Sequence, residues 1–222
     1  MDIFNLFIEA WPLLFEGVQL TLLLTVISII AGTTIAIFLA LGKTYGPKYV
    51  KWPITVFIEI IRGTPLLAQL FILYFGLPPY GINLSGFTVA FIGFTINCSA
   101  YTAEYLRGSI MSIESNQLRV AESLGMRKWQ GIFNIILPQA LRRVVPSWTN
   151  EFIYLLKYTS LAYMIGTHEL MTQAKFFASR NYEFFKVYLI VALFYLVIVL
   201  FFTRIFSYVE KQFKIPGFEF EH

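Results

Sequence analysis

The segment NQLRVAESLGMRKWQGIFNIILPQ, residues 116–139, is the most polar long stretch in a very apolar chain. Hydrophobic runs lie on both sides of it, whereas the segment itself carries Arg119, Glu122, Arg127 and Lys128. A charged side chain in the hydrocarbon core of a bilayer costs several kcal/mol, so this segment is not expected to lie in the membrane. We expect an aqueous loop with a structure of its own, which docks a partner protein.

The composition is that of an integral membrane protein, because 57% of the 222 residues are hydrophobic and only 14% are charged. A helical span needs about 20 apolar residues, so the chain is expected to form one domain, residues 1–222, with roughly five spans. The first sixteen residues contain no Lys or Arg, which is the wrong pattern for a signal peptide. The single cysteine, Cys98, has no partner for an intrachain disulfide and is expected to be buried.

The apolar runs predict an all-α fold with five transmembrane helices. The expected spans cover residues 17–41, 53–76, 87–106, 145–166 and 187–206, after a surface segment, residues 3–15, that is interrupted at Pro12. The second span is expected to break at residues 63–65, Gly-Thr-Pro, with Glu59 and Arg62 forming an ion pair that braces the break. The fourth span is the most polar, and the fifth is expected to face lipid.

Lysine and arginine residues are distributed very unequally between the two sides that these spans define. One side has only Lys175, Arg180 and Lys186, and the other has Lys43, Lys48, Lys51, Arg107, Arg119, Arg127, Lys128, Arg142, Arg143, Arg204, Lys211 and Lys214. The positive-inside rule places the basic side in the cytoplasm, with residues 107–143 and the C-terminus there and the N-terminus outside. The net charge of +4 therefore reflects topology rather than nucleic-acid binding.

The polar loop is expected to form a helix, a turn and a second helix. Asn116 can cap a helix that runs to Leu124, Gly125 supplies a left-handed turn, and a second helix starts at Trp129 before Pro138 bends or ends it. A helix this short is marginally stable in water and needs a surface to dock on.

This loop resembles the cytoplasmic signature, called the EAA loop, of the permease subunits of ABC importers. The residues in register with the family pattern are Ala121, Gly125, Ile135, Leu137 and Pro138. Arg119 stands where the glutamate is usual, and Val120 replaces the first alanine. Further stretches resemble the branch that imports polar amino acids: GVQLTLLLT (17–25), IRGTPLLAQLF (61–71), INCSAYTAEYLRGSI (96–110), GMRKWQ with ILPQALRRVVP (between 125 and 146) and NEFIYLLKYTSL (150–161).

The resemblance implies a transport subunit that is not an enzyme and binds no cofactor, with ATP held by separate ATPase subunits. It implies an external amino-acid-binding protein and a place in a bacterial or archaeal inner membrane. A second permease subunit, identical or different, is expected because five spans with one polar wall would not enclose a sealed pathway alone. The residues expected to couple the chain to the ATPase are Arg119, Ala121, Glu122, Gly125, Met126 and Trp129, with Met126 and Trp129 as apolar anchors. Gly42-Lys43-Thr44 ends like a phosphate-binding loop, but Ile37 stands where that motif needs glycine.

Polar side chains inside the expected spans should line a cavity or contact another helix, because lipid does not solvate them. Helical spacing places Asn97, Tyr101 and Glu104 on one face, Asn150 with Lys157 on another, and Glu151 with Tyr158 on a third. The candidate substrate-binding residues are therefore Asn97, Tyr101, Glu104, Asn150, Glu151 and Tyr158, with helix bracing as the alternative.

Three carboxylates in the spans, those of Glu59, Glu104 and Glu151, favour a cationic substrate, namely arginine, lysine or histidine. Glutamine or another polar amino acid is the alternative. His168 and His222 fall on opposite sides of the membrane, so no metal site is expected.

Two other classes of membrane protein compete with this interpretation. An ion-coupled secondary transporter could use Glu104 or Glu151 as a proton site, but such folds often contain paired repeats with interrupted helices, and only one interrupted span is evident. A membrane scaffold would not transport at all. ATP-dependent accumulation of an amino acid in vesicles that hold the whole complex distinguishes the three classes.

Overall fold

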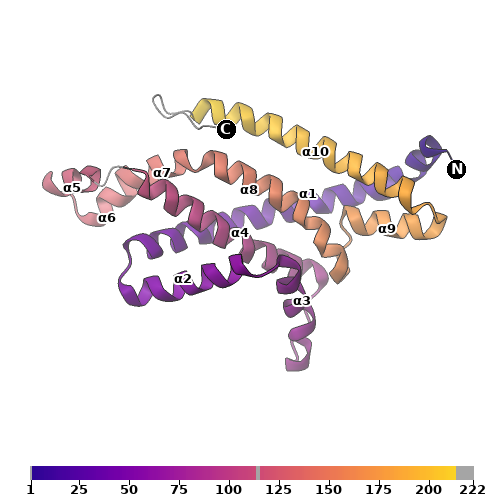
Figure 1. Ribbon diagram of the computed structural model, residues 1–222, viewed down its shortest axis with the longest axis horizontal. Coiled ribbons are helices and arrows are strands. Elements are labelled where there is room, and N and C mark those ends of the chain that lie inside the picture. Colours follow the sequence, from indigo (N-terminus) through magenta and orange to yellow (C-terminus); the bar gives the residue numbers. More distant parts are fainter. Residues whose placement is uncertain (1, 114–115, 214–222) are drawn as a thin grey trace.

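The structure, a computed structural model, describes residues 2–113 and 116–213 and contains only helices, turns and loops in these ranges. Its elements are α1 (Ile3–Tyr45), α2 (Lys48–Gly63), α3 (Leu66–Gly76), η1 (Pro78–Tyr80), α4 (Gly86–Met111), α5 (Asn116–Ser123), α6 (Lys128–Gly131), η2 (Ile132–Ile136), α7 (Leu137–Arg143), α8 (Val145–Tyr158), η3 (Thr159–Ile165), α9 (Leu170–Asn181) and α10 (Phe184–Phe213). Figure 1 shows an elongated bundle with α5 and α6 at one end, and α9 and the start of α1 at the other.

Two helices of the described chain, α1 and α10, are long and apolar enough to span a membrane, and the bent pair formed by α2 and α3 is a third candidate. Only 11% of the most apolar window of α10 is buried, which agrees with a helix that faces lipid. The fourth expected span consists of the 14-residue α8 followed by the 3₁₀-helix η3. The all-helical membrane fold is confirmed, and the number of five spans stays a prediction.

Helix α1 packs through a row of small residues, first along α9 and then along α4. The buried side of α1 includes Gly17, Thr21, Thr25, Ser28, Gly32, Ala36 and Ala40, which recur at intervals of about one turn. A Cβ atom on Gly32 would lie 2.8 Å from Sγ of Cys98, so the two helices approach very closely there. Cys98 is completely buried, as predicted. Small residues stabilise such helix pairs because they let the two backbones approach to van der Waals contact.

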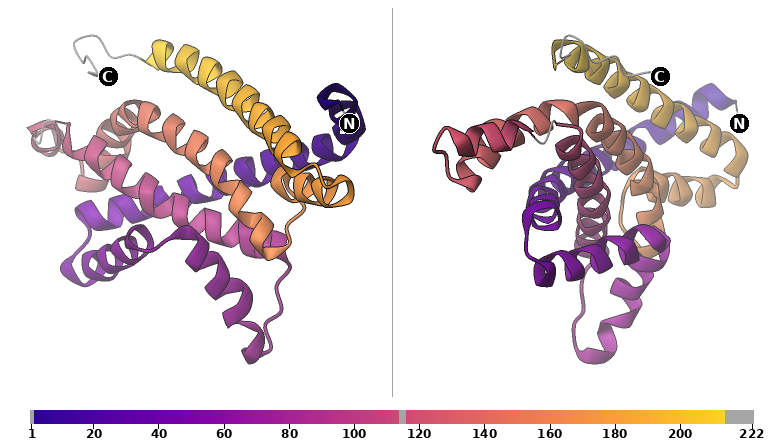
Figure 2. Two further views of the ribbon diagram at one scale, coloured as in Figure 1. Left: turned by 45° about the vertical axis from the view of Figure 1, so that its right-hand side comes forward. Right: turned by 60° about the vertical axis from the view of Figure 1, so that its left-hand side comes forward.

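The start of α1 differs from the expectation. The predicted interruption at Pro12 is wrong, because α1 continues as one helix of 43 residues, although it bends near its N-terminal end (Figure 2). A proline removes only one hydrogen bond from a helix, and packing can maintain the helix around it. Here Leu6, Ala10 and Leu14 are completely buried in a cluster with residues of α9 and α10. Tertiary contacts therefore hold this segment as a helix.

The predicted break at residues 63–65 is confirmed, since the bent pair of helices turns by 102° there. Figures 1 and 2 show α3 pointing away from the bundle. The break is held by Gln69, whose Nε2 donates hydrogen bonds to the carbonyl oxygen of Ile61 (2.8 Å) and to Oγ1 and the carbonyl oxygen of Thr64 (2.9 and 3.1 Å). The amide thereby satisfies carbonyl groups that the end of α2 leaves without partners.

The predicted ion pair between Glu59 and Arg62 is wrong. Glu59 is exposed and has no ion pair within the described ranges, whereas Arg62 lies 4.0 Å from Glu104, measured from Nη1 to Oε2. Spacing of three residues allows contact on a helix, but the carboxylate of a neighbouring helix attracts Arg62 instead.

The polar loop folds as predicted into a helix, a turn and a second helix. Helix α5 is followed by Gly125, which has the left-handed φ of 85°. The second helix is longer than expected, because it passes through the π-helical segment η2 and continues beyond Pro138 to Arg143. The π-helical segment accommodates the proline, which lacks the N–H that an α-helix uses.

Candidate functional site

A cavity of about 110 Å³ between α4 and α8 is lined by four tyrosines and one glutamate: Tyr101, Tyr105, Glu151, Tyr154 and Tyr158. We call it the tyrosine cavity. Helix α4 supplies Tyr101 and Tyr105, and α8 supplies Glu151, Tyr154 and Tyr158. Within each helix these residues are three or four apart, so they lie on one face and can line the same cavity. Glu151 is only 4% exposed, and Tyr105 lines the cavity beside it. A carboxylate surrounded by aromatic rings can bind a positively charged group. The carboxylate forms an ion pair with this group, and the rings contribute cation–π contacts.

Two cations of the protein stand at the edge of the tyrosine cavity. Cζ of Arg62, from α2, lies 5.1 Å from the ring centre of Tyr101, and Nζ of Lys157, from α8, lies 4.7 Å from that of Tyr154. Both distances are within the range of cation–π contacts. The rings of this cavity therefore already attract positive groups.

Glu104 lies one turn from Tyr101 along α4 and is surrounded by cations. Its Oε1 is 2.6 Å from Nζ of Lys43, and its Oε2 is 2.9 Å from Nη2 of Arg107 and 4.0 Å from Nη1 of Arg62. These cations come from α1, α4 and α2, so the carboxylate joins three helices. The contacts favour bracing, one of the two roles that the sequence leaves open for Glu104.

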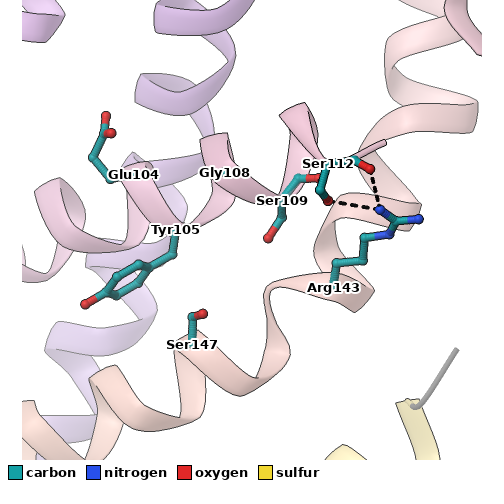
Figure 3. A pocket seen from close by; sticks show the side chains of 7 residues that line it. All are labelled: Glu104, Tyr105, Gly108, Ser109, Ser112, Arg143 and Ser147. Carbon is teal, nitrogen blue, oxygen red and sulfur yellow. Dashed lines mark hydrogen bonds between the residues drawn. The ribbon is translucent and has the colours of Figure 1, made fainter. Parts of the chain in front are cut away.

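A second, open pocket of about 370 Å³ follows the tyrosine cavity toward the α5 end, and Tyr105 lines both. It is lined by Glu104, Tyr105, Gly108, Ser109, Ser112, Arg143 and Ser147 (Figure 3). Arg143 donates from Nη1 to the carbonyl oxygen of Ser112 (2.7 Å) and to its Oγ (2.9 Å), which ties the end of α7 to the end of α4. The two pockets share Tyr105 and are both lined by residues of α4 and of the α7–α8 segment.

The structure brings together only part of the predicted set. Tyr101, Glu151 and Tyr158 all line the tyrosine cavity, whereas Asn97 is buried in α4, Asn150 is exposed on α8, and neither lines the two pockets described above. Tyr105 and Tyr154 also line this cavity and were not among the predicted residues. Their signal was the spacing, since each stands four residues from a tyrosine that was chosen.

The polar loop carries an apolar surface made of Val120, Leu124, Trp129 and Phe133, each at least half exposed, and of these only Trp129 is a predicted coupling residue. We call it the loop surface. Of the predicted coupling residues, Arg119 and Glu122 are exposed beside it and Met126 is half-buried, whereas Ala121 is buried. A Cβ atom on Gly131 would lie 2.8 Å from Cδ1 of Leu118 and 3.4 Å from Cβ of Ala121, so α5 packs tightly on the second helix. An exposed apolar patch on an aqueous loop is typical of a docking surface.

At the opposite end, Glu169 is the N-cap residue of α9 and is completely buried. Its carboxylate accepts hydrogen bonds from the main-chain N–H groups of Met171 and Thr172, both at 2.8 Å, and from the hydroxyl of Tyr195 at 3.2 Å. Burial nevertheless raises the pKa of Glu169 to about 7. The neighbouring His168 is exposed, and no group of metal-binding side chains occurs in residues 2–113 and 116–213.

Comparison with known proteins places this chain among transport proteins. The family model described as "Binding-protein-dependent transport system inner membrane component" matches residues 32–215. The probable amino-acid ABC transporter permease protein YckA of Bacillus subtilis (strain 168) is 42% identical over 195 residues, which cover 87% of this chain and 86% of YckA. The glutamine transport system permease protein GlnP of Escherichia coli (strain K12) is 36% identical over 208 residues, which cover 93% of this chain and 95% of GlnP.

A solved structure has the same fold. It is described as "Crystal structure of an amino acid ABC transporter with histidines" and superposes with a TM-score of 0.89 at 36% identity, covering 96% of this chain and 99% of that one.

Proposed function

The chain belongs to the family of binding-protein-dependent transport system inner membrane components and is an amino-acid ABC transporter permease, and from this premise we propose that its substrate is a basic amino acid. Arginine, lysine and histidine are the candidates. Glu151 would bind the positive group of the substrate, with Tyr101, Tyr105, Tyr154 and Tyr158 around it.

The observation that carries this proposal is the buried carboxylate of Glu151 within the tyrosine cavity. A buried carboxylate is costly unless a cation or hydrogen-bond donors compensate its charge. Tyrosine hydroxyl groups that line the cavity can donate hydrogen bonds, and a cationic side chain entering the cavity would supply the compensating charge. The similar solved structure is that of an amino acid ABC transporter with histidines, which agrees with a basic substrate. The similarity to GlnP favours glutamine as the second candidate.

We infer that the pathway is completed by a second permease subunit. Asn150, Tyr154 and Lys157 lie on an exposed face of α8, and α8 belongs to an expected span. Polar side chains in a span are costly against lipid, so this face should meet water or another protein. Two such faces would enclose a polar pathway, whether the second subunit is identical or different.

The energy for transport would come from separate ATPase subunits that bind ATP and contact the loop surface, with an external binding protein delivering the amino acid. In this arrangement residues 107–143 and the C-terminus are cytoplasmic and the N-terminus is outside. Gln139 Nε2 donates to Gln117 Oε1 at 2.7 Å, so α5 is bonded to α7, and Arg143 bonds α7 to the end of α4. A movement of α5 would reach the pocket-lining helix α4 through these bonds.

The test is uptake by proteoliposomes that contain the permease with its ATPase and binding protein, compared for arginine, lysine, histidine and glutamine. ATP-dependent uptake of a basic amino acid is expected. Glu151→Gln should reduce this uptake by a larger factor than it reduces the uptake of glutamine. Glu16→Gln is the matched control, because Glu16 is exposed in the first half of α1. Equal loss for both amino acids contradicts the basic preference, and uptake driven by an ion gradient without the ATPase contradicts ABC transport.

A further inference from the structure

The start of α2 carries an exposed face that is both basic and aromatic. Residues 48–52 read Lys-Tyr-Val-Lys-Trp, and Tyr49 and Trp52 are 80% and 69% exposed. Lys48 is exposed and Lys51 is half-buried. Because residues three or four apart meet on a helix, Lys48 lies beside both Lys51 and Trp52. We call these four residues, Lys48, Tyr49, Lys51 and Trp52, the α2 face.

The opposite side of α2 makes the contacts that hold this helix in the bundle. Ile58 is 1% exposed and lies in a cluster with residues of α1 and α4, against which Ile54 and Phe57 also pack. A Cβ atom on Gly42 would lie 2.6 Å from Cδ1 of Ile54 and 3.6 Å from Cγ1 of Val50, so this side faces the end of α1. The α2 face is therefore available to a partner.

The two lysines of the α2 face are not neutralised by acidic side chains of the described chain. The ion pairs within residues 2–113 and 116–213 do not include Lys48 or Lys51, whereas the nearby Lys43 is paired with Glu104. The next carboxylate along α2 is that of Glu59, about 12 Å further along the helix axis than Lys51 at about 1.5 Å per residue. The α2 face thus presents uncompensated positive charge.

We propose that the α2 face binds the headgroup of an anionic phospholipid. In the proposed orientation the start of α2 is the cytoplasmic end of an expected span, which is the level of the headgroups of the inner leaflet. Tryptophan and tyrosine are enriched at this level because their rings are amphipathic, and lysines there attract anionic lipids. The ammonium groups of Lys48 and Lys51 would donate to the phosphate, with the ring of Trp52 against the upper acyl chain. Binding would hold the start of the helix that ends at the break before α3.

An ATPase subunit is the other partner that can reach this end of the molecule. The polar loop and the turn between α1 and α2 lie toward the same end of the bundle (Figure 1), and Nζ of Lys128 is 6.0 Å from the ring centre of Tyr45. The loop surface is nevertheless formed by other residues, whereas Trp52 directly precedes the expected span, residues 53–76. An exposed tryptophan at the end of a span, with two lysines beside it, matches a bilayer surface better than a soluble protein.

The experiment measures which lipid touches Trp52 in a bilayer. The permease–ATPase complex is reconstituted in phosphatidylcholine vesicles with increasing fractions of phosphatidylglycerol or phosphatidylcholine that is brominated near the headgroup end of its acyl chains. Bromine quenches tryptophan fluorescence on contact, and the signal of Trp52 is the difference between the wild type and Trp52→Phe. Brominated phosphatidylglycerol should reach half of its full quenching at a roughly fivefold lower fraction than brominated phosphatidylcholine.

The double variant Lys48→Gln with Lys51→Gln should lose this preference and leave quenching by brominated phosphatidylcholine unchanged. The matched control is Lys175→Gln with Arg180→Gln, which removes two exposed cations from α9 and should retain the preference. Equal loss in the two double variants, or equal quenching by both lipids in the wild type, would overturn the proposal. Absence of quenching by either lipid would show that a protein covers the α2 face, which also overturns it. Melting temperatures of the complexes show that the variants are folded.

Discussion

Nζ of Lys43, near the end of α1, lies 2.6 Å from Oε1 of Glu104 on α4 and joins the two helices that share the most extensive contact in the described part of the chain. Arg107 holds the other oxygen of the same carboxylate from the next turn of α4. The side chain of Glu104 is only 13% exposed, and that of Lys43 is 17% exposed. Removing one partner of a largely buried ion pair costs more stability than removing one partner of an exposed pair, because the remaining charge is poorly hydrated.

Glu104→Gln should therefore destabilise the protein, by about 3 kcal/mol, because it leaves the ammonium group of Lys43 in a largely buried place without its carboxylate. Arg107→Gln should cost less, since the pair of Lys43 and Glu104 remains. Thermal unfolding of the purified chain in detergent measures both effects. A Glu104→Gln variant that melts like the wild type and loses only substrate binding would restore Glu104 as a substrate contact.

The break between α2 and α3 should depend on one amide. Gln69→Leu keeps the approximate size of the side chain but removes all its hydrogen bonds to Ile61 and Thr64. We expect a loss of about 1 kcal/mol, since partly exposed acceptors at the end of α2 lose a hydrogen-bond donor. Thr64→Val removes only one of the three acceptors and should have a smaller effect on the melting temperature. The opposite order of the two variants would contradict this role of Gln69.

Close packing of α1 on α4 gives a prediction with a control in the same pair of helices. Gly32→Ala places a Cβ atom 2.8 Å from Sγ and 2.9 Å from Cβ of Cys98, so the helices must move apart, at a cost of about 1–3 kcal/mol. Gly108→Ala in α4 meets no atom within 4 Å and should be neutral or stabilise the helix by about 0.5–1 kcal/mol. Equal melting temperatures for the two variants would contradict the close contact.

These contacts show which parts of the fold follow from sequence alone. The break at residues 63–65, the burial of Cys98 and the left-handed Gly125 depend on local chemistry, namely a Gly-Thr-Pro sequence, an apolar run and a glycine after a short helix, and the sequence predicted all three. The partner of Arg62 depends on which helix lies beside α2, and the continuation of α1 through Pro12 depends on burial against α9 and α10. A sequence pattern does not contain this information.

The candidate site shows the same division. Face sharing on one helix was predictable, and Glu151 and Tyr158 do line one cavity. The pairing of that face with Tyr101 and Tyr105 of α4 required the relative rotation of two helices, which periodicity leaves undetermined. Asn97 and Asn150 were chosen because they are polar residues in expected spans, and their helix faces direct them elsewhere.

The buried Glu169 should make stability depend on pH. Burial raises its pKa from the ordinary value of 4.5 to about 7, so between these values the folded state binds more protons than the unfolded state. The free energy of unfolding must then fall as the pH rises from about 4.5 to 7, by on the order of 3 kcal/mol for this group. The stabilisation is fully present below this window and lost above it.

Glu169→Gln removes the titrating group, so its melting temperature should change less between pH 5 and pH 8 than that of the wild type. Glu16→Gln, which alters an exposed carboxylate, should retain the wild-type difference. The same pH dependence in the wild type and in Glu169→Gln would assign the effect to another group.

The most exposed residue of the loop surface offers a test of coupling that does not disturb the fold. Leu124 is 79% exposed and lies between the end of α5 and the turn at Gly125. If an ATPase covers it, burial of a leucine side chain contributes about 1.5–3 kcal/mol, so Leu124→Ser should weaken ATPase binding by roughly 10–100-fold. Phe185, which is 81% exposed at the other end of the molecule, provides the control Phe185→Ser.

Binding of the purified ATPase to the solubilised permease, measured beside the melting temperature of the permease alone, separates docking from folding. If the Leu124→Ser permease is folded and binds the ATPase as tightly as the wild type does, the contact lies elsewhere on the loop.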